Sequence, residues 1–154
     1  MTTQLKIKIK DNHELRIKID DLYTKSNQII LAKWSLIIAK RILKAASIDY
    51  KNFIEITEGF QVNKLWQNDK VRMHDVRQAS FKIHKIARSC YSEIEKSAFR
   101  TAGQAVASGH IREHAMVASD YAIKTIGLIA KNDTKIITKE RRWQLNELDR
   151  LFIR

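Results

Sequence analysis

The stretch HIREH at residues 110–114 has the form H-x-x-E-H, a spacing that can hold a catalytic zinc ion. In such a site two histidines bind the metal, the glutamate between them activates water, and a further acidic residue completes the coordination. The motif needs His110 and His114 on one continuous helix, yet the glycine just before them stands where a helix could end. The only glutamates further along the chain are Glu140 and Glu147. A metal-dependent hydrolase is therefore an alternative and not the leading prediction.

A second group of residues with binding chemistry is spaced along one predicted helix. Four side chains recur at every third or fourth position and form one stripe: Arg77, Phe81, His84 and Arg88. The stripe is expected to lie roughly opposite the apolar face of the helix. Arginine binds a carboxylate at two points and also binds phosphate. We predict that Arg77, His84 and Arg88 contact an acidic partner, with a solvated polar face as the alternative.

Charge and composition narrow the class of partner. The 154 residues carry a net charge of +12, and the excess of basic groups is spread along the chain. Such a surface suits an acidic protein or a nucleic acid, although simple solvation would explain it too. The lone cysteine, Cys90, excludes an internal disulfide, and the first residues have no continuous apolar core for export. The most apolar segment, 29–43, is interrupted by lysine and arginine and is too short to span a bilayer. We expect a cytoplasmic protein that lies in no membrane.

The first 20 residues differ in pattern from the rest. LKIKIK at 5–10 and LRIKID at 15–20 both alternate charged with apolar residues, which is the period of a β-strand. We predict an N-terminal extended arm or β-hairpin over residues 1–20, followed by a helical domain over residues 21–154. Such an arm could also pair with another chain, so a homo-oligomer formed through it is possible.

Beyond Asp20 the apolar residues repeat every three or four positions, which is the period of a helix. The chain has no proline and only four glycines, so long helices can form with little interruption. We predict an all-α single-domain bundle of five to six helices. The segment 93–109 is rich in alanine, glycine and serine, whose small side chains let helices approach closely. It is therefore expected to be the central helix.

The segment AFRTAGQAVASGHIREHAMVASDYAIKTIG at 98–127 resembles the putative immunity protein family, small helical proteins that neutralise polymorphic bacterial toxins. The resemblance extends over roughly residues 30–150. Ser80, His84, Ala87 and Arg88 resemble the family's A-x-x-x-H-x-x-A-R helix, and residues 140–144 resemble its closing E-R-x-W-Q. Eight positions carry the family's motifs without a defined role: Gly103, His110, His114, Tyr121, Glu140, Arg141, Trp143 and Gln144.

The resemblance also bears on the two histidines. The family has small or variable residues at the positions between them, so Glu113 is not part of its motif. The resemblance therefore implies that Glu113 is not a catalytic base. It implies that His110 ends one helix and His114 begins the next, with the rings hydrogen-bonding across the junction. Gln104 stands where the family often has histidine.

The leading prediction is a non-enzymatic cytosolic protein that binds an acidic surface of a bacterial toxin and needs no cofactor. A basic helical nucleic-acid-binding protein is the first alternative, and a metal-dependent hydrolase built on His110 and His114 is the second. An antidote to a nuclease faces a cationic active site and is expected to be acidic. The charge of +12 therefore argues against a nuclease as the target.

Overall fold

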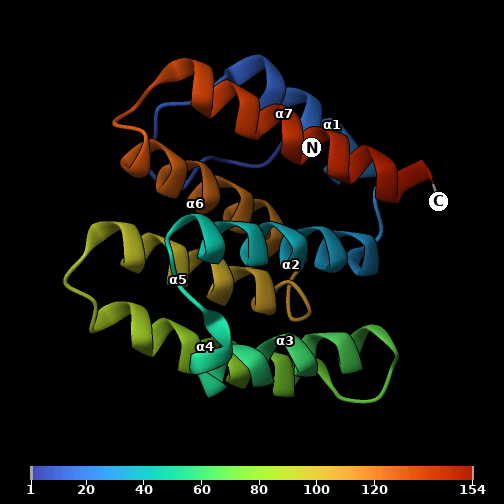
Figure 1. Cartoon of the computed structure of the whole chain (residues 1–154). Helices are drawn as coiled ribbons and strands as arrows, with labels where there is room; N and C mark the ends of the chain where they lie inside the picture. Colours follow the sequence, from blue (N-terminus) through green and yellow to red (C-terminus); the bar gives the residue numbers. More distant parts are fainter. Residues whose placement is uncertain (1, 154) are drawn as a thin grey trace.

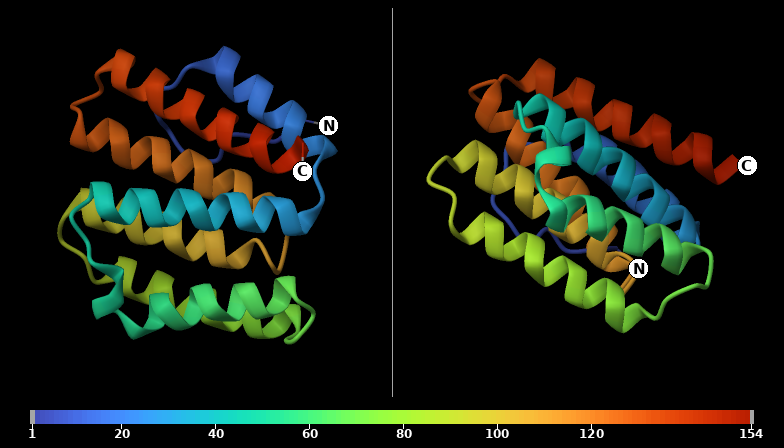
Figure 2. Two further views of the ribbon diagram at one scale, coloured as in Figure 1. Left: turned by 45° about the vertical axis from the view of Figure 1, so that its right-hand side comes forward. Right: turned by 60° about the horizontal axis from the view of Figure 1, so that its bottom comes forward.

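The computed structural model describes residues 2–153, which form seven α-helices in a stacked bundle. The helices are α1 (His13–Lys25), α2 (Gln28–Ala45), α3 (Ile54–Gln67), α4 (Met73–Arg88), α5 (Glu93–Ala107), α6 (Glu113–Ile129) and α7 (Thr134–Ile153), with a 3-10 turn, η1 (Tyr50–Asn52), before α3. Figure 1 shows α1 and α7 at one end of the stack, α2, α5 and α6 in the middle, and α3 and α4 at the other end. The views in Figure 2 show the same order.

The all-α class is confirmed, but the number of helices in residues 2–153 is seven rather than five or six. The additional helix is α1, which replaces the second strand of the predicted β-hairpin. The side chain of Asn12 accepts a hydrogen bond from the Leu15 N–H at 3.1 Å and caps this helix. Leu15, Ile19 and Tyr23 recur every four residues and are buried, whereas Ile17 is 60% exposed. The alternating letters of 15–20 therefore also fit a helix, and the helical face is the one that packs on α7.

Residues 2–12 remain extended, as expected for an arm, and no strand occurs in residues 2–153. We call this segment the arm. In Figure 1 it is the dark blue thread that runs beside α6 on its way to α1. The predicted boundary between residues 20 and 21 lies inside α1, so the arm is shorter than 20 residues.

Helix α5 lies at the centre of the bundle, because it contacts α2, α3, α4 and α6. Ser92 caps its first turn by accepting a hydrogen bond from the Glu95 N–H at 3.2 Å. Its small buried residues let neighbouring helices approach closely, and the Ser35 hydroxyl of α2 lies 3.3 Å from the Ala105 carbonyl of α5. The central position predicted for the small-residue segment is confirmed, with the helix ending at Ala107 rather than 109. Within the part of the chain described, no helix is both long and apolar enough to cross a membrane.

Candidate functional site

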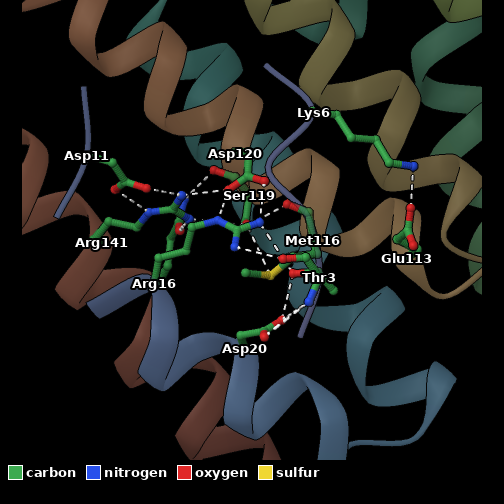
Figure 3. Close-up of polar contacts among 11 residues, drawn as sticks. Thr3, Lys6, Asp11, Arg16, Asp20, Glu113, Met116, Ser119, Asp120 and Arg141 are labelled. Atoms are coloured by element: carbon green, nitrogen blue, oxygen red, sulfur yellow. Dashed lines mark hydrogen bonds and ion pairs between the residues drawn. The ribbon is translucent and has the colours of Figure 1, made fainter. Parts of the chain in front are cut away.

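Arg141, the second residue of the closing motif, lies at the centre of a buried polar network (Figure 3). Its side chain is 0% exposed. The guanidinium donates two hydrogen bonds of 2.8 Å to the carboxylate of Asp11 and one of 2.6 Å to Asp120. It also donates to the Gln144 amide oxygen at 3.0 Å and to the Ser119 hydroxyl at 3.3 Å. Arginine has five N–H donors, and this arrangement uses all of them. Arg141 is therefore an interior group that joins the arm, α6 and α7.

Three contacts fasten the arm to the bundle, and two of them belong to the network around Arg141 and Arg16. The anchors are Thr3 on Asp20, Lys6 on Glu113 and Asp11 on Arg141. Arg16 reinforces the network by pairing with the other side of Asp120 at 2.9 Å. Figure 3 shows that these side chains come from the arm, α1, α6 and α7.

Glu140 and Trp143 of α7 both contact Arg41 of α2. The buried carboxylate of Glu140 accepts two hydrogen bonds from Arg41, at 2.8 and 3.1 Å. The Arg41 guanidinium also lies over the Trp143 ring, 4.1 Å from its centroid. The arginine is thus held by a two-point ion pair on one side and an aromatic face on the other.

Gln144 completes the motif. Its backbone carbonyl accepts a hydrogen bond of 2.9 Å from the indole N–H of the buried Trp34, and its side-chain amide donates to the Ser119 carbonyl at 3.1 Å. Every residue of E-R-x-W-Q that the family pattern specifies therefore contacts another part of the bundle, and only Trp143 among them is partly exposed.

His84 and Gly103 fit against each other where α4 meets α5. A methyl group added at Gly103 would come within 2.6 Å of the His84 ring, so glycine is needed for this close approach. The Nδ1 atom of His84 lies 2.9 Å from a guanidinium nitrogen of Arg100. Because arginine only donates, Nδ1 accepts this bond and the ring is neutral. Burial lowers the pKa of His84 to about 4, and the charge of Arg100 contributes.

His110 and His114 do not share a helix. His110 lies in the turn after α5, and His114 is the second residue of α6, so the predicted helix junction is confirmed. The rings stack with centroids 6.2 Å apart instead of hydrogen-bonding to each other as expected. Nδ1 of His114 instead lies 2.7 Å from the side-chain oxygen of Gln104 on α5. Burial lowers the pKa of His114, and the proximity of His110 lowers it further.

This geometry differs from that of a zinc hydrolase. Glu113, the residue that would activate water, forms an ion pair with Lys6 of the arm. Across residues 2–153 no three histidine, cysteine, aspartate or glutamate side chains are grouped closely enough to hold a metal ion. Tyr121, another motif position, is half-buried, and its carbonyl accepts hydrogen bonds from Ser97 and Thr125.

The stripe on α4 is only partly as predicted. Arg77, Phe81 and Arg88 are exposed, and the Arg77 guanidinium lies 4.8 Å from the centroid of the Phe81 ring. His84 instead turns toward α5 and is half-buried, because α4 is covered by both α3 and α5 and its buried face is correspondingly wide. Two further exposed side chains extend the stripe. Met73 lies at the start of α4, and Tyr91 lies just beyond its end.

Comparison with known families agrees with this architecture. The sequence pattern of the Imm-5 like putative immunity protein family matches residues 21–151. The chain belongs to this family. The matched region begins inside α1 and ends within α7, so it contains the buried motif residues and the stripe on α4 but not the arm. No curated protein and no solved structure matches the chain significantly.

Several residues of the site were not found by sequence reasoning. Asp11 and Asp120 neutralise Arg141, Arg41 pairs with Glu140, and Arg100 bonds to His84. Asp120 carried a usable signal, since a charged residue in the largely apolar stretch 115–123 is expected to need a buried cation. The other partners carried none, because their pairing depends on how distant helices pack. Gly103, Glu140, Arg141 and Gln144 thus make interior contacts, and the exposed residues provide the candidates for a binding surface.

Proposed function

We propose that this member of the family is a non-enzymatic cytosolic protein that neutralises a protein toxin by binding an acidic surface on it. The observation that carries the proposal is the exposed set of residues on and just beyond α4, which we call the α4 strip: Met73, Arg77, Phe81, Arg88 and Tyr91. Family membership supports the toxin as the class of partner.

The chemistry of the α4 strip is that of a protein interface. Arginine, methionine and aromatic residues are enriched at such interfaces and supply most of their strongest contacts. Phe81 is 47% exposed and Tyr91 101% exposed, so both present apolar surface to solvent. Neither Arg77 nor Arg88 has a carboxylate partner within residues 2–153. Both guanidinium groups are therefore free to form two-point bonds with carboxylates of another protein.

His84 contributes from beneath the strip. It is neutral and accepts a hydrogen bond from Arg100, which holds that guanidinium at the half-exposed edge between α4 and α5. Arg100 therefore supplies a third arginine, beside the part of α4 where His84 and Arg88 lie. This role of His84 is positional, whereas the two arginines of the strip contact the partner directly.

The test uses the full chain as bait for proteins from the cells that produce it, with an Arg77→Ala/Arg88→Ala variant as the comparison. The captured toxin domain is then produced with either version in a growth assay. We expect the original chain to restore growth and the variant to fail, because truncating one member of a partly desolvated ion pair costs about 2–5 kcal/mol. Arg88→Ala alone should weaken the complex well over about tenfold with an almost unchanged melting temperature.

Two results would contradict the proposal. A sharp fall in melting temperature for Arg88→Ala would mean that the arginine is structural. Binding of arbitrary nucleic acid that weakens roughly 10³-fold between 50 and 200 mM salt would instead indicate phosphate contacts. The net charge of +12 makes nucleic acid the rival ligand, so this salt titration belongs in the first set of measurements.

A further inference from the structure

The arm has a backbone with unused hydrogen-bonding capacity. The backbone N–H and C=O groups of residues 4–10 form no hydrogen bond with any other part of the chain from residue 2 to 153. Lys6, Lys8 and Lys10 are exposed, whereas Ile7 and Ile9 are half-buried, as in a strand with one face on the bundle. The chain bends at Ile7, so residues 8–11 form the straight section that follows. An extended segment with free N–H and C=O groups can pair with another strand.

A cavity opens beside this straight section. It has a volume of about 290 Å³, roughly ten times the share of liquid volume of one water molecule. Its lining consists of Lys8, Ile9 and Lys10 from the arm, Ile123, Lys124, Gly127 and Leu128 from α6, and Asn132 from the following turn. The interior is mainly apolar, and three lysines stand around it. None of these lysines has a carboxylate partner in residues 2–153.

We propose that the arm and α6 form a docking site for an extended acidic segment of a protein partner, which adds beside residues 8–11 as a β-strand. Backbone hydrogen bonds to the arm provide affinity in this mode, and pockets for alternate side chains provide specificity. An apolar side chain of the segment enters the cavity. The acidic residues on either side of it meet Lys8, Lys10 and Lys124.

The charge of the arm indicates which kind of segment binds beside it. Lysines at alternate positions of the arm match a strand with acidic residues at alternate positions, because opposite charges on facing strands attract. A second copy of this chain would place its own arm lysines opposite Lys8 and Lys10, and like charges directly opposite each other are destabilising. The arm is therefore complementary to an acidic partner and not to a second copy of itself. The site is separate from the α4 strip and rests on the proposed function only in that the natural partner is a protein.

The experiment measures fluorescence anisotropy of an acetylated, amidated hexapeptide of alternating glutamate and valine, labelled with a rhodamine dye, titrated with the full chain. We expect saturable binding that weakens at least about tenfold in Lys8→Glu/Lys10→Glu. Lys82→Glu/Lys85→Glu makes the same charge change at exposed positions of α4 and should bind like the unaltered chain. Arg77→Ala/Arg88→Ala should also leave peptide binding unchanged, so this inference and the proposed function can fail separately.

Backbone pairing has its own readout, which uses the unaltered chain. Two further hexapeptides, one N-methylated at its valines and the other at its glutamates, keep the side chains and charge but each loses the backbone donors of one strand edge, and we expect the one methylated on the edge that faces the arm not to bind. The amides of residues 8–11 should become protected from hydrogen exchange when the unmethylated peptide binds. The proposal is overturned if the hexapeptide shows no saturable binding, or if both N-methylated peptides bind as well as the unmethylated one. It is also overturned if ultracentrifugation finds a dimer whose arm amides are protected without peptide, because a second copy then occupies the site.

Discussion

Replacing Arg141 by alanine tests whether the closing motif maintains the fold. The guanidinium is fully buried and donates to Asp11, Asp120, Ser119 and Gln144. Its removal affects the two carboxylates differently. Asp120 keeps its ion pair with Arg16, whereas Asp11 keeps only the hydrogen bond that it accepts from the Asn12 N–H at 2.8 Å. The destabilisation therefore comes mainly from a buried aspartate that has lost its cation.

The expected loss can be bounded. Removing one partner of a buried ion pair costs about 3–5 kcal/mol. The arm can move outward and let water reach Asp11, so the lower half of this range is expected. In a chain of this size each 1 kcal/mol lowers the melting temperature by roughly 2–4 °C, so Arg141→Ala should melt roughly 6–16 °C below the unaltered chain. The released arm should also be cleaved faster by trypsin at its lysines.

Urea unfolding followed by circular dichroism measures the change, and the neighbouring residue provides the control. Arg142 is exposed, so Arg142→Ala removes the same side chain from the surface and should change stability by less than about 0.5 kcal/mol. Equal melting temperatures for the two variants would refute the reasoning, because the buried network would then contribute nothing that a surface arginine does not.

Three further outcomes are expected. Gly103→Ala should destabilise the chain by about 1–3 kcal/mol through its contact with His84, and much less when combined with His84→Ala, as unfolding in urea would show; equal losses in both backgrounds would exclude this contact as the cause. The folded-state pKa of His84, about 4, lies below its unfolded value near 6.5, so the unfolded chain binds the proton more readily between these pH values. Stability should therefore fall by on the order of 2 kcal/mol as pH drops from 6.5 to 4, and His84→Gln should show a shallower slope; an identical slope in the two proteins would contradict the assignment. Elemental analysis of purified protein should find no stoichiometric zinc and no peptide should be cleaved, whereas tight zinc lost in both His110→Ala and His114→Ala would restore the hydrolase alternative.

Local patterns were sufficient to predict the helices but not the state of the first 20 residues. Six alternating residues at 15–20 fit a strand and also place Leu15 and Ile19 four positions apart, as in a helix. The Asn12 cap and packing on α7 select the helix, and only the cap could have been read from the sequence. Residues 5–10 have no such cap and stay extended.

The sequence was sufficient to select residues of the site, but not to predict which partners they contact. The family resemblance selected Arg141 and Glu140, but not the aspartate 130 positions away or the arginine 99 positions away that neutralise them. For His84, periodicity gave the correct stripe but not the width of the buried face. That width depends on α4 being covered by two helices, which is a property of tertiary packing and not of a single helix.

The pairing of Asp11 with Arg141 has a consequence for biosynthesis. These residues are 130 positions apart, and at 5–20 residues per second the ribosome takes roughly 7–26 s to travel between them. During this interval the arm has emerged but its buried cation has not yet been made, so the segment LKIKIK cannot be fastened at that end. A chaperone or a partner present at the ribosome would meet the arm in this open form. Closure at the Asp11 end must follow the synthesis of α7, which makes this contact one of the last to form during folding.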